Sequence, residues 1–507
     1  MEPERVKRLT LAAAVLGSAI ALLDSTIVGV ALPTIQRSLG GGLAGQQWIS
    51  SAYLLTLGSL ILVGGSLGDI FGERRVFALG TGGFGLASLL CAISPTIGLL
   101  TAARAVQGVA GALLTPSSLA VIAATFPDEE RGAAIGTWTA FGAIATVIGP
   151  LVGGELLALA SWRWLFLINV PLVVGCLALI LTVIPRAQRS SLRRRRVDLA
   201  GALLCASGLA GVVFALIEAP RLGWSDPEIV VSLLAGAVLF GGFLLRERRA
   251  RDPMLPLAIF RRANFAAANV ETFAVYAALA VFSFFLILFL QQVAGYSPLR
   301  SGLTLLPATV VMFSLSRYVG RLSARFGPRL FMSAGPALAA AGLLLAQRIG
   351  RNPGYFPDVF PAVVVFGLGL SLTVAPLTTT VLAGVENEGA GIASAVNNAV
   401  ARVAGLLATA GVGAIVAAHF GATLHARLAT VTLGRAVRKT IAAAERLVLG
   451  RPSVSGLPRA QGNAILRAAD AASLSSFHLG IAIAAALLAL GALIGLAGIR
   501  NPRAHPG

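Results

Sequence analysis

Long apolar runs separated by short polar loops dominate the chain. Runs with few or no charges recur at about the 20 residues that a helix needs to cross the hydrocarbon of a bilayer. They predict about fourteen membrane-spanning helices, near residues 9–33, 47–67, 76–94, 98–123, 132–157, 164–184, 198–217, 228–245, 265–290, 301–320, 330–347, 358–382, 391–418 and 476–498. We therefore expect an all-α integral membrane protein, because each helical span satisfies its own backbone hydrogen bonds.

The composition agrees with this pattern. Of the 507 residues, 56% are hydrophobic and 12% are charged, whereas soluble domains carry about 25% charged residues. The net charge of +19 comes from Arg and Lys gathered in alternate loops, such as "RRRR" at 193–196 and "RERRAR" at 246–251. By the positive-inside rule both termini are cytoplasmic, so the number of spans is even. These charges fix topology and touch lipid headgroups, and we expect no nucleic-acid partner.

No motif for covalent or nucleotide chemistry stands out. The only lysines are Lys7 and Lys439, and "GRAVRKT" at 434–440 lacks the second glycine of a phosphate-binding loop. The four histidines show no metal-binding spacing, and the three cysteines lie within apolar runs. We expect no enzyme, no metal and no cofactor, so active transport has to draw on an ion gradient. The preference for Arg over Lys suggests a GC-rich bacterium and its cytoplasmic membrane.

A short segment of the chain occurs twice. "GSLGDIFGER" at 65–74 and "GRLSARFGPR" at 320–329 align without gaps, and both follow a span that heads into the cytoplasm. Duplication explains this context better than chance does, and parallel repeats around a central substrate site are a transporter architecture. We expect a six-helix bundle at 1–184, two additional spans with basic linkers at 185–250, and a second six-helix bundle at 251–507 that includes an outer loop, 419–475.

These motifs resemble those of the major facilitator superfamily, in its fourteen-span drug:proton antiporter branch. The loop after the second span resembles the first signature, GxLaDrxGrk, although Ile70 and Glu73 stand where basic residues are common. "LLTAARAVQGVAGALL" resembles the second signature, "VIGPLVGGEL" the antiporter signature, and "ALLDSTIVGVALP" the fourth. Branch-level stretches such as "WRWLFLINVP" and "SAVNNAVARVAG" extend the resemblance over nearly the whole chain apart from 419–475. It implies proton-driven export of drugs or antibiotics.

Asp24 lies in the middle of the first apolar run. An ionised carboxylate in hydrocarbon costs several kcal/mol, so such residues usually mark ion or proton paths. A carboxyl group that meets a dry environment in one state and a cation in another can load a proton on one side and release it on the other. We interpret Asp24 as the proton-coupling carboxylate; a hydrogen bond that merely packs helices is the alternative.

Arg402 lies deep in the thirteenth span, too far from either end to snorkel. It needs an inward-facing partner, for which Asp24 and Glu155 are the candidates. Protonating the acid would then release Arg402 and switch the relative stability of the two bundle orientations. The alternatives are a purely structural ion pair and a Glu155 that is merely solvated. The resemblance implies that Arg104 supports proton transfer, unless it only packs against backbone carbonyls.

The loop at 65–75 is expected to form a cytoplasmic gate. In it Asp69 can pair with Arg74 or Arg75, or cap a helix N-terminus in the opposite half. Opening toward the cytoplasm would break this latch. Charges that only fix topology are the alternative. The predicted gate residues are Gly65, Asp69, Gly72, Arg74 and Arg75.

The fifth span carries the antiporter motif. Pro150 removes a backbone donor and is expected to bend the helix. Gly149, Gly153 and Gly154 let a neighbouring helix approach closely, which predicts a tight contact between the halves that limits proton leakage. Small-residue packing without gating is the alternative.

Polar and aromatic residues in other spans are candidates for the substrate cavity, although residues that join helices would look the same. They are Gln107, Tyr53, Tyr276, Phe273, Asn397 and Asn398. The leading hypothesis is export of a lipophilic small molecule by a monomer, driven by the proton motive force. Alternatives are export of lipids or of an endogenous metabolite, and a membrane sensor or scaffold that does not transport.

Overall fold

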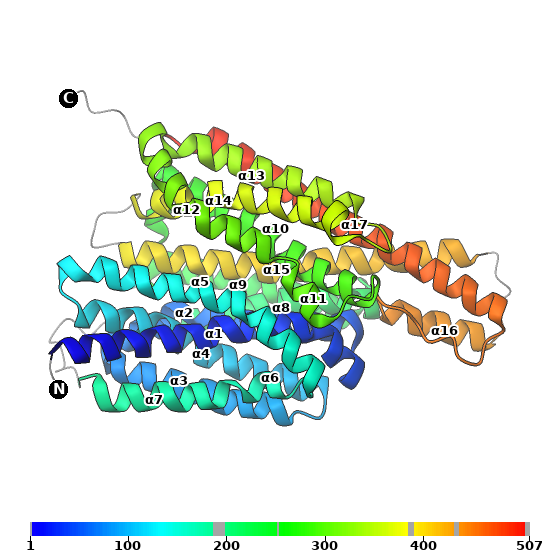
Figure 1. Ribbon diagram of the computed structural model, residues 1–507, viewed down its shortest axis with the longest axis horizontal. Helices are drawn as coiled ribbons and strands as arrows, with labels where there is room; N and C mark the ends of the chain where they lie inside the picture. Colours follow the sequence, from blue (N-terminus) through cyan, green and yellow to red (C-terminus); the bar gives the residue numbers. More distant parts are fainter. Residues whose placement is uncertain (1–2, 186–197, 251–252, 384–389, 430–434, 502–507) are drawn as a thin grey trace. The chain divides into compact units, whose positions relative to one another are not determined.

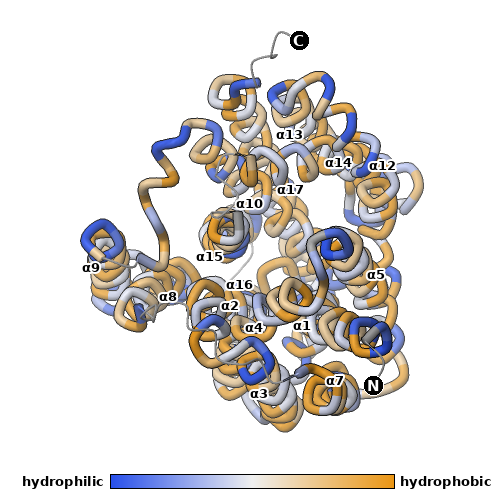
Figure 2. Tube along the Cα trace, turned by 90° about the vertical axis from the view of Figure 1, so that its left-hand side faces the viewer, coloured by the Kyte–Doolittle hydropathy of each residue, from blue (hydrophilic) through white to orange (hydrophobic). Residues whose placement is uncertain are grey.

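The computed structural model describes residues 3–185, 198–250, 253–383, 390–429 and 435–501. Within these ranges the chain is helical and contains no strand (Figure 1). Fourteen of the helices in the described part are long and apolar enough to cross a membrane, which confirms the expected number. Figure 2 shows hydrophobic residues along the helices and hydrophilic ones at several helix ends. The basic run at 193–196 lies outside the described residues.

The helices form two compact units. The first unit contains Met1–Gly40, Trp48–Val212 and Ser232–Pro256, and the second contains Gly41–Gln47, Val213–Val231 and Leu257–Gly507. The division therefore runs through the two additional spans, which the sequence places between the bundles.

The described residues of the first unit form nine helices, some of which belong to it only in part. They are α1 (Pro3–Leu39), α2 (Gly42–Phe71), α3 (Glu73–Ile93), α4 (Ile97–Thr125), α5 (Asp128–Leu159), α6 (Trp164–Leu167), α7 (Asn169–Val183), α8 (Leu199–Leu222) and α9 (Pro227–Arg249). A buried cluster that includes Ile20, Phe77, Phe84, Leu114 and Val173 joins α1, α3, α4 and α7. This packing holds the inner faces of these four helices in fixed register.

The second unit follows the same plan. Its helices are α10 (Ala263–Gln292), α11 (Pro298–Leu303), α12 (Leu306–Phe326), α13 (Pro328–Leu345), α14 (Phe360–Ala383), α15 (Ala390–Leu428), α16 (Arg435–Arg446) and α17 (Arg459–Gly498), with short turns at Leu257–Arg261, Ala346–Arg348 and Tyr355–Val359. Aromatic pairs tie α10 to its neighbours: Phe282 meets Phe366 edge to face, and Phe289 stacks on Phe477 with ring centroids 4.3 Å apart. Offset and edge-to-face pairs are favourable arrangements of aromatic rings.

The repeated segments have the same backbone conformation. Gly72 joins α2 to α3 with φ 89° and ψ 132°, and Gly327 joins α12 to α13 with φ 85° and ψ 149°. A positive φ of this size is readily adopted only by glycine. The shared glycine is thus explained by the sharp turn that both copies make.

The repeated arginines also make equivalent contacts. Arg74 Nη2 donates to the carbonyl of Leu181, at 2.6 Å, and Arg329 Nε donates to the carbonyl of Leu496, at 2.8 Å. Each acceptor lies in the last turn of the sixth membrane helix of its own unit, α7 or α17. Cations are stabilised at helix C-termini, where carbonyls lack intrahelical donors. The two copies are therefore alike in contact as well as in sequence, which supports duplication.

Much of the segment predicted as an outer loop, 419–475, is helical. α15 continues to Leu428, α16 follows, and α17 begins at Arg459, well before the predicted start of the last span. The reason lies in the buried face of α15, which continues through Phe420, Leu424 and Leu428. A helix of 40 residues such as α17 is about 60 Å long at 1.5 Å per residue, twice the hydrocarbon thickness. Regularly spaced apolar residues within this otherwise polar stretch thus allow both helices to continue beyond the predicted spans.

Candidate functional site

Asp24 lies at the centre of the first unit, on α1, with 0% of its surface exposed. Its carboxylate accepts three hydrogen bonds from side chains of two other helices. Arg104 Nη1 donates to Oδ2 at 2.5 Å, and Gln107 Nε2 and Asn169 Nδ2 each donate to Oδ1 at 2.9 Å. Charge-assisted bonds of this kind are short and strong. The cost of placing a carboxylate inside a membrane protein is offset here by a complete set of donors.

Arg104 is the cation of this site, and α4 places it one turn before Gln107. It is 2% exposed. Besides Asp24, it donates to Gln107 Oε1 at 2.6 Å and, through Nε, to the carbonyl of Ile49 at 3.2 Å. Its Cζ lies 4.3 Å from the centroid of the Tyr53 ring, a cation–π distance. The guanidinium therefore joins α1, α2 and α4.

A second layer fixes the two amides. Ser88 on α3 accepts from Gln107 Nε2 at 2.9 Å and from Asn169 Nδ2 at 3.2 Å, and donates to the carbonyl of Phe84 at 2.8 Å. Because both amide nitrogens must donate, their orientations are set by this layer and not by Asp24 alone. Ser88 and Asn169 were not named by the sequence analysis. The signal for Asn169 is an amide within the apolar stretch "WRWLFLINVP".

In this arrangement the packing around Asp24 depends on whether its carboxyl group is charged. Binding a proton would remove the negative charge and turn one acceptor atom into a donor, which conflicts with the three donors that face it. Arg104 would be left buried without its anion, and removing one member of a buried pair costs about 3–5 kcal/mol. Protonation of Asp24 is thereby linked to the packing of α1, α3, α4 and α7.

The guanidinium beside Asp24 belongs to Arg104. Arg402, for which Asp24 and Glu155 are the candidate partners, lies on α15 in the second unit. There it is half-buried and close enough to Tyr276 for an electrostatic interaction. No ion pair to Arg402 is found among the described residues of the second unit. Glu155, the other expected partner, is exposed near the end of α5.

The residues predicted to line a substrate cavity fall into two groups. Gln107 and Tyr53 are buried parts of the Asp24 network. On α10, Tyr276 is half-buried and Phe273 is 37% exposed. On α15, Asn397 donates to the hydroxyl of a buried threonine at 2.7 Å, and the exposed Asn398 donates to a carbonyl of its own helix at 3.0 Å. The structure thus leaves Phe273, Tyr276 and Asn398 as the accessible candidates.

The glycines of the antiporter motif pack against α1. A Cβ atom on Gly149 would lie 2.0 Å from Thr26 Oγ1, and one on Gly153 would lie 3.2 Å from the Ile27 side chain. Gly154 is also buried, and α5 continues through Pro150 without interruption. The close approach that the motif predicts is therefore present, but it joins two helices of the same unit, α1 and α5. These contacts lie within two or three residues of Asp24, so the motif positions the helix that carries the carboxylate.

The predicted gate residues surround the turn between α2 and α3. Asp69 and Arg75 are exposed there, and Gly65 and Gly72 are half-buried. Arg74, which was expected to pair with Asp69, donates to the end of α7 as described above. This motif therefore also anchors the last helix of its own bundle.

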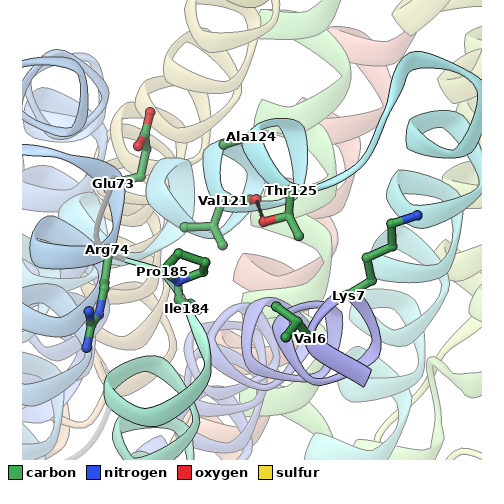
Figure 3. A pocket seen from close by; sticks show the side chains of 9 residues that line it. All are labelled: Val6, Lys7, Glu73, Arg74, Val121, Ala124, Thr125, Ile184 and Pro185. Carbon is green, nitrogen blue, oxygen red and sulfur yellow. Dashed lines mark hydrogen bonds between the residues drawn. The ribbon is translucent and has the colours of Figure 1, made fainter. Parts of the chain in front are cut away.

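A hollow of about 400 Å³ lies between the ends of α1, α3, α4 and α7 (Figure 3). Apolar side chains such as Val6, Val121 and Ile184 line most of it. Lys7 and Arg74 extend to opposite sides, and both are already engaged: Lys7 Nζ lies 2.7 Å from a Glu130 carboxylate oxygen. Both basic residues of the hollow are therefore engaged elsewhere, and we do not assign a site to it.

A charged pair buried among membrane-spanning helices, with its hydrogen bonds satisfied, is typical of the ion or proton paths of secondary transporters. Among the described residues no group of three or more His, Cys, Asp and Glu side chains is placed to hold a metal ion. Fold and site together define a polytopic membrane transporter.

Comparisons with known proteins identify the family. The Major Facilitator Superfamily matches residues 14–409. The chain is 36% identical to multidrug resistance protein Stp of Mycobacterium tuberculosis over 84% of this chain and 78% of the relative. It is 32% identical to the tetracenomycin C resistance and export protein of Streptomyces glaucescens over 96% of this chain and 90% of the relative. A bacterial homologue of the human lysosomal transporter Spinster, solved in an inward-facing, unoccupied conformation, shares the fold with a TM-score of 0.67 at 15% identity, covering 98% of this chain and 99% of that one.

The chain therefore belongs to the major facilitator superfamily, as its signature motifs predicted. It is a multi-pass protein of the bacterial cytoplasmic membrane. Family and fold are those of small-molecule transporters and not of enzymes.

Proposed function

We propose that the protein is a proton-coupled exporter of hydrophobic or amphipathic small molecules, such as drugs or antibiotics. Two relatives, a multidrug resistance protein and a tetracenomycin C resistance and export protein, support the substrate class by their names. The observation that carries the coupling is Asp24, a fully buried carboxylate whose only charged partner among the described residues is Arg104. No cofactor is required, because the membrane potential supplies about 2.3 kcal/mol per charge per 100 mV.

In this cycle Asp24 is ionised in the conformation described above and is held by its three donors. A proton that arrives from the outer side neutralises it, and the network around Arg104 loses its anion. The cost of that unpaired guanidinium favours the opposite orientation of the bundles, in which the proton leaves toward the cytoplasm. Substrate that enters from the cytoplasm or the inner leaflet is carried outward by the reverse movement, so one gradient drives the other. Both termini lie in the cytoplasm in this scheme, and the working unit is a monomer among membrane lipids.

Reconstituted protein tests the proposal directly. Proteoliposomes with an imposed pH gradient are given tetracenomycin C, ethidium or a fluorescent phospholipid, and accumulation is followed with and without a protonophore. We expect gradient-dependent accumulation of at least one of the first two, abolished by the protonophore. Movement of the phospholipid alone would favour lipid export. No proton flux with any probe would support the sensor or scaffold alternative and contradict the proposal.

A further inference from the structure

Glu271 is a buried acid of the second unit that the proposed cycle does not use. It is 0% exposed, and neither carboxyl oxygen accepts or donates a hydrogen bond within the part of the chain that the structure describes. It is also the one charged residue of α10. An ionised carboxylate without a partner in such a place would cost several kcal/mol. The packing therefore accommodates the neutral acid.

The neighbours of Glu271 in the helix show which surface it faces. One turn before it, the side chain of Ala267 lies 2.8 Å from the position of a Cβ on Gly498. One turn after it, Ala274 and Val275 lie 3.6 Å from that of Gly491. Residues three and four apart share a helix face, so Glu271 lies on the face of α10 that packs against α17. Small residues of α17 bring the two helices close at this level.

No charged group faces this acid from the helices that pack on α10. α14 has no charged residue, and α17 has none between Asp470 and its end at Gly498, His478 being its one titratable group there. α15 places Arg402 beside Tyr276, on another face of α10. The remaining charges on elements that contact α10 lie away from this level: Arg261 in the turn Leu257–Arg261 and Arg300 on α11 are each close to one end of the helix. Those of α15 and α17 belong to the stretch 419–475 and are Arg427, Arg459, Arg467 and Asp470. In the described part of the chain Glu271 thus lacks a charged partner because none of the surrounding helices offers one, and not because a single contact is missing.

A polar cluster begins one residue away. Asn397 on α15 donates to Thr272 Oγ1 at 2.7 Å and to Asn269 Oδ1 at 3.3 Å. Thr272 and Asn269 are buried, whereas Asn397 is only half-buried. This cluster leads from the level of Glu271 toward a more exposed side of α15. It lies where α10 meets α15, one residue from Glu271 along the helix.

Asp24 and Glu271 are opposites in their surroundings. The first accepts three hydrogen bonds, one from a guanidinium, while the second accepts none from described residues. A pair of acids in such contrasting environments is a pattern of sites that hold different protonation states at the same pH. The surroundings of Asp24 suit a carboxylate, and those of Glu271 suit a neutral carboxylic acid.

We propose that Glu271 is a second proton-binding site of the transporter, which carries a proton while Asp24 is ionised. When α10 moves against α15 or α17, the carboxylic O–H bond breaks, the proton passes to water, and a carboxylate remains until a proton from the other side of the membrane restores the acid. The inference rests on the proposed proton-coupled function. It implies that each cycle moves one more proton than Asp24 alone provides.

Infrared spectroscopy of the reconstituted protein tests the site without any substrate. A protonated carboxyl group gives a C=O stretching band, and the band due to this residue is found by subtracting spectra of Glu271→Gln from wild type. We expect it to be present in wild type and in Asp24→Asn, absent in Glu271→Gln, and reversibly lost as the pH is raised across the range in which transport operates. A band that does not change over this range would mean a permanently neutral packing group, and the proposal would be wrong.

Transport thermodynamics gives an independent readout. With ethidium as the probe and the membrane potential held at zero, one proton fewer per cycle lowers the limiting accumulation ratio about tenfold for each unit of pH gradient. We expect this loss in Glu271→Gln, and recovery toward wild type in Glu271→Asp, which restores an ionisable group. Glutamine has the shape of the neutral acid, so a packing role predicts a wild-type ratio for Glu271→Gln and would overturn the proposal.

Glu228→Gln makes the same chemical change at an exposed position at the start of α9 and serves as the matched control. If Glu271→Gln does not fold, the ratio measured with Glu271→Asp and the pH response of the wild-type band decide the question: an unchanging band overturns the proposal. If wild type accumulates none of the probes under a pH gradient, the proposed function fails. The infrared titration still decides whether Glu271 exchanges its proton.

Discussion

Replacing Asp24 by Asn tests the coupling assignment with the smallest possible change of shape. Asparagine keeps one acceptor oxygen but replaces the other by an amide nitrogen, which is a donor. In the structure, one carboxylate oxygen faces Arg104 and the other faces the amides of Gln107 and Asn169. Whichever way the new amide is turned, it meets at least one donor, and the guanidinium loses its anion.

The size of the effect follows from these contacts. Removing one member of a buried ion pair costs about 3–5 kcal/mol, which corresponds to a change on the order of 100- to 1000-fold or more in a conformational equilibrium. Asp24→Asn imitates the protonated state, so this free energy acts against the conformation described here and no longer depends on pH. A transporter whose switch is fixed in this way cannot couple a proton gradient to its substrate.

Proteoliposomes loaded with ethidium provide the assay. A pH gradient is imposed, and the initial rate and final accumulation ratio are compared for wild type, Asp24→Asn and the control Asp226→Asn, a carboxylate in the loop between α8 and α9. We expect Asp24→Asn to lose gradient-driven accumulation and the control to retain it. Accumulation by Asp24→Asn at the wild-type rate and to the wild-type ratio would refute the assignment of Asp24 as the coupling residue.

Three further predictions concern Arg104 and the glycines of the helix contacts and turns. Arg104→Lys removes the planar guanidinium that reaches several acceptors at once. We expect the free energy of unfolding to fall by about 1–3 kcal/mol, seen as a lower midpoint of thermal unfolding and weaker gradient-driven accumulation. An unchanged midpoint would contradict this prediction. Gly149→Ala puts a Cβ 2.0 Å from a threonine hydroxyl of α1 and should destabilise the protein by about 1–3 kcal/mol. Gly136→Ala, which has open space around it, is the control and should not. Equal thermal unfolding midpoints for the two variants would show that α1 and α5 adjust freely. At both Gly72 and Gly327 an alanine would have to adopt a positive φ, and at Gly327 its Cβ would also lie 2.4 Å from a neighbouring side chain. Gly72→Ala should therefore lower the free energy of unfolding by about 1–2 kcal/mol, and Gly327→Ala should lower it more. The reverse order of the thermal unfolding midpoints would be inconsistent with this geometry.

Hydropathy was sufficient to predict the number of spans, because transfer into lipid requires an almost uninterrupted apolar segment of known length. It could not locate the ends of α15 and α17, since a helix that leaves the bilayer can continue for as long as it has another surface to pack against. Buried Phe420 and Leu424 supply such a surface. A scale based on transfer into lipid treats the polar residues between them as loop.

The cost of an isolated charge in lipid also identified Asp24 from sequence, but not its partner. Arg104 and Arg402 are both arginines within apolar spans, and the sequence does not say which faces of α1, α4 and α15 meet. The pairing with Arg104 depends on packing between residues 80 positions apart. Asn169 escaped notice for a different reason: a neutral amide in an apolar span carries a smaller penalty than a charge, and amides also join helices without any functional role.

Duplication explains the shared scaffold of the two units, and their chemistry shows how far the copies have diverged. The turns at Gly72 and Gly327 and the arginines that follow them serve the same structural purpose in each copy. The buried charges do not follow this symmetry. In the first unit a carboxylate is surrounded by donors, and in the second a buried acid, Glu271, has no hydrogen-bond partner among the described residues. Because the scaffold tolerates either arrangement, the free energy of binding a proton to each acid is set by the hydrogen-bond donors around it and not by the fold. Exchanging these donors between the two sites is therefore a route to changing how many protons drive one transport cycle.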